Sequence, residues 1–294
     1  MTPPASAPVA AVIIPHYNDT LRLHRCLEAL MPQMTGHPEV ELVIVDNNSS
    51  DDLEPLRQAF PGLRIVTEMT RGAGPARNRG VRETTAPNIF FLDADCVPAE
   101  DWLARALSLA GSADLVGGRV DTFDETPAPR SGAEAYETAY AFQQRFYVEQ
   151  RGFSVTANLL TTRDVFLDTG DFIDGLPEDM EWCQRATGKG YSLIYADTLR
   201  VSHPTRSDWS ALKRKWVRLT KERQALFGDS PKARLVWAIR SGAVVVNAVL
   251  QVPRALRYPG LSTGERMAAI ATLFRLTGQR VIWMLRQSLG LKLG

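Results

Sequence analysis

Two aspartates, Asp93 and Asp95, stand one residue apart at the end of the apolar run from Ile89 to Leu92. In an extended strand, residues i and i+2 point to the same side, so the two carboxylates can converge on one point. Carboxylates that close repel each other unless a cation joins them. Oxygen ligands favour Mg²⁺ or Mn²⁺, which usually complete their shells with water and substrate phosphates. The pair therefore predicts a divalent-ion site; a solvated turn capped by Asp95 is the alternative.

Residues elsewhere could recognise the nucleoside and phosphates of a metal-bound ligand. Asp46 could accept the N3–H of uracil, or the N1–H and amino group of guanine. Tyr17 could stack on the base, and Asn18 could supply an amide. The segment RGAGPARNRG, residues 71–80, combines glycine flexibility with cations suited to a diphosphate. Its arginines are Arg71, Arg77 and Arg79. A turn with surface arginines is the alternative interpretation of this segment.

The elements that must position these residues are apolar strands alternating with helical segments. Strands are predicted at 9–15, 41–46, 63–68 and 89–93, with a further strand at 114–121. Strands this apolar are covered on both faces, which indicates an α/β fold with a mostly parallel, mixed sheet flanked by helices. Ligands of such sheets bind beyond the carboxyl ends of the strands. The clusters PHYND, DNNSSDD, RGAGPARNRG and DADC each follow one of the first four strands. They predict one shared site.

Bulk composition is that of a globular protein. The chain has 294 residues, of which 45% are hydrophobic and 23% charged, and this excludes a disordered or fibrous protein. Three widely separated cysteines argue against a disulfide framework and for a reducing compartment. Residues 1–15 lack a positive start and a long apolar run, so we expect no signal peptide and a cytoplasmic protein.

Charge is divided unevenly along the chain. Residues 1–203 hold 17 Lys and Arg against 29 Asp and Glu, whereas residues 204–294 hold 17 against 4. A helix at 133–150 and two short strands before residue 204 complete the body of the chain. We therefore predict an acidic domain at 1–205 that carries the site and a basic helical extension at 206–294.

The extension contains amphipathic and apolar helical segments. Residues 207–227 alternate apolar and basic positions at helical spacing, and Ser262 with Glu265 forms a capping-box pattern. The longest uncharged run, 241–253, has 13 residues, whereas a membrane span needs about 20. We expect either packing on protein or, preferably, peripheral binding to an anionic membrane surface. Four tryptophans would then lie near the headgroups: Trp209, Trp216, Trp237 and Trp283. No nucleic-acid recognition motif is present.

The order of these motifs resembles the family 2 glycosyltransferases of the GT-A fold. The motifs are VIIPHYN, VIVDNNSSD, RGAGPARNRG, FLDADC and PEDMEWCQRATGKGY, and the resemblance spans residues 9 to 205. It implies binding of a nucleotide-sugar donor, a UDP-sugar by preference, with Mn²⁺ or Mg²⁺. It also implies inverting transfer to a glycan or lipid-linked acceptor in polysaccharide, glycolipid or cell-envelope synthesis.

The resemblance also assigns roles to residues. Asp93 and Asp95 would bind the metal, with help from His203, and Asp179 would be the catalytic base, with Glu178 as second choice. The implied donor-binding residues are Pro15, Tyr17, Asn18, Asp46, Arg71, Gly72, Arg77, Asp93, Ala94 and Asp95. The implied residues of the sugar and acceptor cleft are Asn158, Arg163 and Trp182.

Other functions remain possible at this point. Acidic residues at positions 178 and 179 could simply stabilise the start of a helix. A nucleotidyltransferase also pairs aspartates with a metal, but its first strand would be followed by a glycine-rich, lysine-containing segment rather than PHYNDTLRL. A non-catalytic, membrane-associated scaffold would tolerate loss of Asp179.

Overall fold

The computed structural model describes residues 7–293, so part of the N-terminal segment in which we expect no signal peptide, residues 1–6, lies outside the described residues. The chain forms two compact units. The first comprises Met1–Asp121, Gln143–Asp174 and Glu178–His203. The second comprises Thr122–Phe142, Gly175–Pro177 and Pro204–Gly294.

A mixed sheet forms the centre of the first unit. Its strands are β1 (Ala10–His16), β2 (Val40–Asp46), β3 (Ile65–Thr67), β4 (Asn88–Leu92), β5 (Val97–Pro98), β6 (Leu115–Phe123), β7 (Asn158–Thr162) and β8 (Leu193–Pro204). Their order is β3-β2-β1-β4-β7-β6-β8-β5. Parallel pairing joins β3, β2, β1 and β4, whereas β7 is antiparallel to both β4 and β6. The predicted α/β class with a mixed sheet is confirmed, and its parallel part contains the four strands expected to carry the site.

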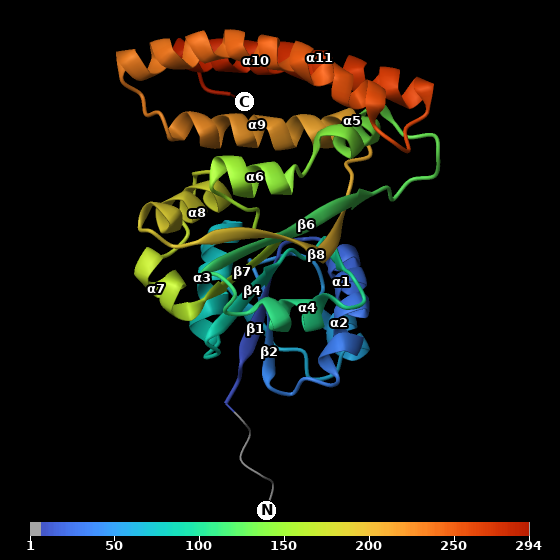
Figure 1. Ribbon diagram of the computed structural model, residues 1–294, viewed down its shortest axis with the longest axis vertical. Helices are drawn as coiled ribbons and strands as arrows, with labels where there is room; N and C mark the ends of the chain where they lie inside the picture. Colours follow the sequence, from blue (N-terminus) through green and yellow to red (C-terminus); the bar gives the residue numbers. More distant parts are fainter. Residues whose placement is uncertain (1–6, 294) are drawn as a thin grey trace, which may run out of the picture. The chain divides into compact units, whose positions relative to one another are not determined.

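Helices cover both faces of this sheet (Figure 1). They are α1 (Thr20–Met34), α2 (Glu54–Ala59), α3 (Ala73–Glu83), α4 (Trp102–Leu109), α6 (Gln144–Arg151), α7 (Arg163–Thr169) and α8 (Glu178–Gly188). Residues Ile89–Leu92 of strand β4 are apolar because they pack against helices on both faces of the sheet. Phe90 meets Trp102 of α4 edge to face, whereas the next residue, Phe91, points the other way toward Phe166 and Phe172. Successive side chains of a strand alternate between faces, and both faces here are buried.

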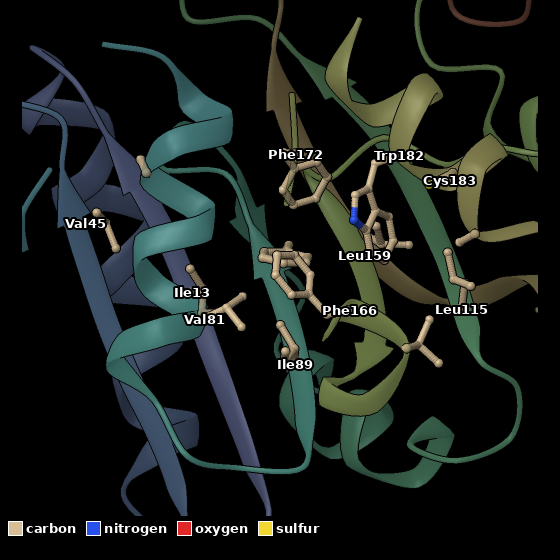
Figure 2. Close-up of a cluster of buried hydrophobic side chains, with 14 of the residues drawn as sticks. Ile13, Val45, Val81, Ile89, Leu115, Leu159, Phe166, Phe172, Trp182 and Cys183 are labelled. Atoms are coloured by element: carbon tan, nitrogen blue, oxygen red, sulfur yellow. The ribbon is translucent and has the colours of Figure 1, made fainter. Parts of the chain in front are cut away.

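An aromatic cluster fills the core on the α3, α7 and α8 side of the sheet (Figure 2). The ring centroids of Trp182 lie 5.6 Å from Phe166 and 5.1 Å from Phe172. The indole N–H of Trp182 donates to the carbonyl of Gly170 at 2.8 Å. This packing attaches the start of α8 firmly to the sheet.

The second unit is helical. It contains α5 (Gly132–Tyr140), α9 (Trp209–Ala225), α10 (Pro231–Arg257) and α11 (Thr263–Ser288), and α11 packs against each of the other three. The capping box predicted at Ser262 and Glu265 is present at the start of α11. The carboxylate of Glu137 in α5 is buried between Arg206 and Lys215, at 3.0 and 2.7 Å. Burial alone would raise the pKa of Glu137, but these two cations hold it below its usual value.

Two expectations about the chain between β6 and β8 differ from the structure. The helix predicted at 133–150 is two helices, α5 and α6, because the backbone breaks at Phe142 with a φ of 48°. The short α5 groups with the C-terminal helices, so the second unit takes in Thr122–Phe142 as well as residues beyond 205. The two short strands expected before residue 204 are the single strand β8.

The C-terminal helices differ from expectation in two respects, which are the burial of their tryptophans and the hydropathy of α10. Trp237 and Trp283 are buried in the unit's core, and Trp209 and Trp216 lie beneath arginine guanidinium groups. Burial of Trp237 and Trp283 keeps these two indoles from the surface, whereas Trp209 and Trp216 are half-buried. Among the described residues, α10 is long and apolar enough to cross a membrane, with a mean hydropathy of 1.6 in its most apolar window.

Candidate active site

Residues from all four predicted polar clusters line one open pocket of about 360 Å³ in the first unit. The pocket lies where β1, β2, β3 and β4 end, because parallel strands bring their carboxyl ends to the same edge. The lining residues are Pro15, His16, Tyr17, Asp19, Asn47, Arg71, Gly72, Ala73, Ala76, Arg77, Asp93, Ala94 and Asp95.

The two aspartates occupy a turn rather than the end of the strand. Strand β4 ends at Leu92, and the amide of Cys96 donates to the carbonyl of Asp93 at 3.0 Å. The extended geometry expected for Asp93 and Asp95 is therefore wrong, because the chain folds back after β4. Asp93 Oδ1 lies 2.5 Å from a guanidinium nitrogen of Arg77. Asp95 Oδ2 lies 3.1 Å from Nε2 of His203, which comes from β8.

Arg77 links the pocket to the start of α8. It is buried, and its two terminal nitrogens pair with Asp93 at 2.5 Å and with Glu178 at 2.6 Å. Burial opposes its charge, but Asp93, Glu178 and Asp179 together raise the pKa of Arg77 above its ordinary value. One permanent cation therefore joins a carboxylate of the pocket to the helix that carries the predicted base.

Asp46 lies at the end of β2 and is almost fully buried. Its Oδ1 is 3.1 Å from Nδ1 of His16, and its Oδ2 accepts from the amide of Ser49 at 3.1 Å. Both carboxylate oxygens thus already have a partner. These contacts orient Asp46 beside the pocket wall that His16 contributes.

The other two predicted nucleoside residues differ in what their side chains do. Tyr17 lines the pocket and is 51% exposed, so its ring is accessible for stacking. Asn18 has a φ of 48°, and its Oδ1 accepts from the amide of Ser50 at 2.7 Å. Asn18 thereby organises the loop after β2. This use competes with direct contact to a base.

Asn47 is a pocket residue that the sequence reasoning missed. Its side-chain amide donates to the carbonyls of Glu68 and Thr70 at 3.0 and 2.7 Å, and its Oδ1 accepts from the amide of Gly72 at 2.8 Å. It therefore holds the loop between β3 and α3 against the end of β2. The sequence did offer one indication of this role, because Asn47 directly follows Asp46 at the end of a predicted strand.

Gly72 has a conformation that favours glycine. Its φ is +132°, and an added Cβ would lie 2.8 Å from Oδ1 of Asp174. The residue caps α3, whose first turn forms one wall of the pocket. A side chain here would strain the backbone and push that wall away from Asp174.

Glu178 and Asp179 start α8 and diverge as expected. Glu178 accepts from the amide of Gly74 at 3.0 Å, in the first turn of α3, and pairs with Arg77. Asp179 Oδ1 instead accepts from the hydroxyl of Thr156 at 2.7 Å, and Thr156 is fully buried. Glu178 thus joins two helix ends, whereas Asp179 is held through Oδ1 and, among residues 7–293, its Oδ2 accepts no hydrogen bond of this kind. Thr156 was not identified from the sequence.

The environment of Asp179 favours its protonated form. Burial is the largest cause and raises the pKa of Asp179 to about 6, and the neighbouring charges of Glu178 and Asp93 act in the same direction. Arg77 and the hydroxyl of Thr156 act in the opposite direction. A carboxylate with a pKa near 6 is mostly ionised at neutral pH and remains a competent proton acceptor.

The three residues assigned to the acceptor cleft have structural partners instead. Asn158 is fully buried and bonds to the indole of Trp102 and to backbone carbonyls. Arg163 donates to the carbonyls of Val81 and Ala86 at the end of α3. Trp182 belongs to the aromatic core. Packing and hydrogen bonds thus occupy Asn158 and Trp182 fully and Arg163 in part.

The metal site expected here is only partly assembled by protein side chains. Within residues 7–293, no three His, Cys, Asp or Glu side chains group closely enough to hold a metal ion. Asp95 and His203 nevertheless bring an oxygen and a nitrogen ligand together at the pocket edge. Mg²⁺ and Mn²⁺ commonly take their other ligands from phosphates and water, so these two residues fit such an ion.

Comparison with known proteins identifies the family of the chain. Residues 11–170 match the sequence model of glycosyl transferase family 2. Glycosyltransferase AglE of Haloferax volcanii is 33% identical over 245 residues, which cover 80% of each chain.

Two solved structures share the fold. The mannosyltransferase PcManGT from Pyrobaculum calidifontis, in complex with GDP-Man and Mn²⁺, has a TM-score of 0.60 at 20% identity and covers 95% of this chain and 88% of its own. TarS 1–349 of S. aureus, in complex with UDP-GlcNAc, has a TM-score of 0.55 at 14% identity and covers 96% and 80%. The chain therefore belongs to glycosyltransferase family 2 and has the GT-A fold.

Proposed function

We propose that this glycosyltransferase inverts the anomeric centre of a nucleoside diphosphate sugar in a single displacement, with Asp179 as the base. One observation carries this proposal: Arg77 joins Asp93 of the donor pocket to Glu178, directly beside Asp179. A donor held in the pocket would thus lie in one charged network with a carboxylate whose pKa is about 6. The site supports a donor and a base acting together.

The donor would lie along the carboxyl ends of the strands. Tyr17 stacks on the base, and Asp46 accepts one N–H from it. Both oxygens of Asp46 already have a protein partner, which leaves less capacity for the two donors of guanine than for the single N3–H of uracil. We therefore favour a UDP-sugar. The diphosphate would lie near Arg71 and the first turn of α3, where backbone amides favour an anion.

Asp95 and His203 are the residues that would hold Mn²⁺ or Mg²⁺, and PcManGT, which shares the fold, was solved with Mn²⁺. Such an ion, when bound, neutralises negative charge on the diphosphate. Asp93 has a different task in this proposal. Its ion pair with Arg77 keeps the cation at the pocket wall and leaves the carboxylate less free to act as a ligand.

Asp179 takes the proton of the acceptor hydroxyl while the oxygen attacks the anomeric carbon and the bond to the diphosphate breaks. Thr156 holds one carboxylate oxygen, so the proton would go to the other. Glu178 is less suited to this role because Arg77 and the amide of Gly74 already bind its two oxygens. Attack opposite the leaving diphosphate inverts the anomeric centre.

The proposal also covers the acceptor and the place in the cell where transfer occurs. We place catalysis in residues 1–205 and assign the helices beyond them to a membrane surface or to protein packing. A glycan or a lipid-linked hydroxyl acceptor at the cytoplasmic face of a membrane agrees with the basic charge of residues 204–294.

Calorimetric titration of UDP and GDP, with and without Mn²⁺, tests the donor site. We expect metal-dependent binding of one nucleotide that is at least tenfold weaker in Asp95→Asn. Asp229→Asn is the matched control, because this carboxylate is 78% exposed and belongs to the second unit. If neither nucleotide binds the folded native protein with any metal, the donor-site proposal is overturned.

A second experiment separates the enzyme from the scaffold interpretation. Asp179→Asn should bind nucleotide like the native protein while sugar transfer falls by about 10²- to 10⁴-fold, as for loss of a general base. Unchanged transfer would refute Asp179 as the base, whereas a biological output that survives without transfer would favour the scaffold.

A further inference from the structure

Helix α10 has apolar residues on two opposite faces. Its inner face carries the buried Trp237, Ser241, Ala248 and Ala255. Its outer face carries five aliphatic side chains at helical spacing that are 56–71% exposed. These are Leu235, Ile239, Val246, Val249 and Leu250. A helix on the surface of a water-soluble protein is normally polar on its solvent-exposed face, but the solvent-exposed face of α10 is apolar.

Helix α11 repeats this arrangement. Ala269, Leu273, Leu276 and Trp283 are buried, and the opposite face carries five large apolar side chains that are 43–74% exposed. These are Met267, Phe274, Ile282, Leu285 and the C-cap residue Leu289. We call these five residues and the five of α10 the outer apolar face.

The two stripes lie on the same side of the second unit. Helices α10 and α11 run side by side along their lengths, and both pack on α5 through their buried faces (Figure 1). A buried hydrogen bond from the indole of Trp237 to Gln287 at 2.9 Å joins them. Because the inner faces share a supporting helix, the outer faces both point away from it. The result is one extended apolar surface, which in soluble proteins marks a binding site.

Cationic residues border this surface. Arg254 lies beside the α10 stripe and Arg286 beside that of α11 at helical spacing, whereas Arg240 and Arg275 stack on Phe227 and Trp209. Long arginine side chains can keep their charges in water while their stems cover apolar surface. Residues 204–294 hold 17 cationic and 4 acidic side chains, which opposes self-association and favours an anionic partner.

We propose that the outer apolar face lies in the headgroup region of an anionic lipid bilayer, with α10 and α11 parallel to the membrane plane. This specifies the membrane partner of the proposed function and rests on it. It places the contact on aliphatic residues and Phe274, instead of on the four tryptophans expected from the sequence.

The same observations argue against a spanning α10. Its 27 residues would measure about 40 Å as a helix, long enough to cross. However, its buried residues are spread from Trp237 to Ala255, so α11 and α5 cover its inner face over most of its length. Arg240 and Arg254 also lie at the two ends of its 13-residue uncharged run, where a spanning helix would bring their charges near the hydrocarbon region. An in-plane helix satisfies both features.

Flotation of the full chain with vesicles tests this proposal. We expect the protein to float with vesicles of phosphatidylcholine containing about a third phosphatidylglycerol, and much less with phosphatidylcholine alone. Leu250→Glu and Phe274→Glu should each reduce the partition coefficient at least tenfold. Leu167→Glu is the matched control, because it is the same substitution at a leucine that is 66% exposed on α7, outside the outer apolar face. It should float like the native protein.

Other outcomes would overturn the proposal. Native protein that ignores anionic vesicles, or Leu250→Glu that floats normally, would exclude this contact. A concentration-dependent dimer lost in Leu250→Glu, without vesicle binding, would assign the face to a second copy. Retention in vesicles after alkaline carbonate washing would indicate a span. Nucleotide binding in solution should be unchanged in Leu250→Glu, so loss of vesicle binding is distinguishable from failure of the donor site or of folding.

Discussion

Replacing Thr156 by valine should move the acid limb of the pH profile to higher pH. The buried hydroxyl donates to Oδ1 of Asp179 at 2.7 Å and so stabilises the ionised carboxylate. Valine has a similar shape but no donor. Asp179 would then ionise less readily, although position 156 does not touch the reacting atoms in the proposed mechanism.

The size of this change follows from the hydrogen bond. A bond to a charged group contributes about 1.5 to 3 kcal/mol, and about 1.4 kcal/mol corresponds to a tenfold change in acidity. The pKa of Asp179, about 6 in the native protein, would therefore rise by roughly one to two. At pH 7 the ionised fraction, and with it kcat/KM, would fall about two- to tenfold. At pH 9 most of the activity would return.

The assay is kcat/KM from pH 5 to 9, measured by UDP or GDP release from the donor that the calorimetric screen identifies. Thr156→Ser is the matched control because it keeps the hydroxyl, and its acid limb should match the native one. An acid limb that stays in place in Thr156→Val, or a uniform loss at all pH values, would refute the role of this hydrogen bond.

Three further predictions follow from the same contacts. Glu178→Gln removes a charge that raises the pKa of Asp179, so its acid limb should move to lower pH, and loss of the ion pair with Arg77 should cost about 1 to 3 kcal/mol in urea denaturation. The folded-state pKa of Asp179 lies above its ordinary 3.8, so its contribution to stability is present below pH 4 and is lost as pH rises through 6. Asp179→Asn should therefore be more stable than the native protein at pH 8, by at most about 3 kcal/mol, and equally stable near pH 4; equal stability at both would contradict the burial argument. Gly72→Ala should lower stability by about 1 to 3 kcal/mol and weaken nucleotide binding, since its Cβ would meet Asp174, and unchanged thermal melting would contradict the strain.

Local sequence patterns were sufficient for the fold and for the edge of the sheet where the pocket lies. Apolar runs alternating with helices indicate parallel strands, and polar residues after each strand must then meet at one edge. The capping box at Ser262 and the charge contrast between the two parts of the chain were readable in the same way. These features depend on short-range spacing or composition, which the sequence displays directly.

The partners of individual side chains depended on the tertiary structure. Asp93 pairs with Arg77, Asn158 bonds to Trp102, and α5 joins helices far along the chain. Such contacts join residues tens of positions apart, and a turn of one or two residues redirects a side chain entirely. The pKa of Asp179 and the outer apolar face of α10 and α11 depend likewise on what is buried, because burial is a property of the packed chain and not of any segment within it.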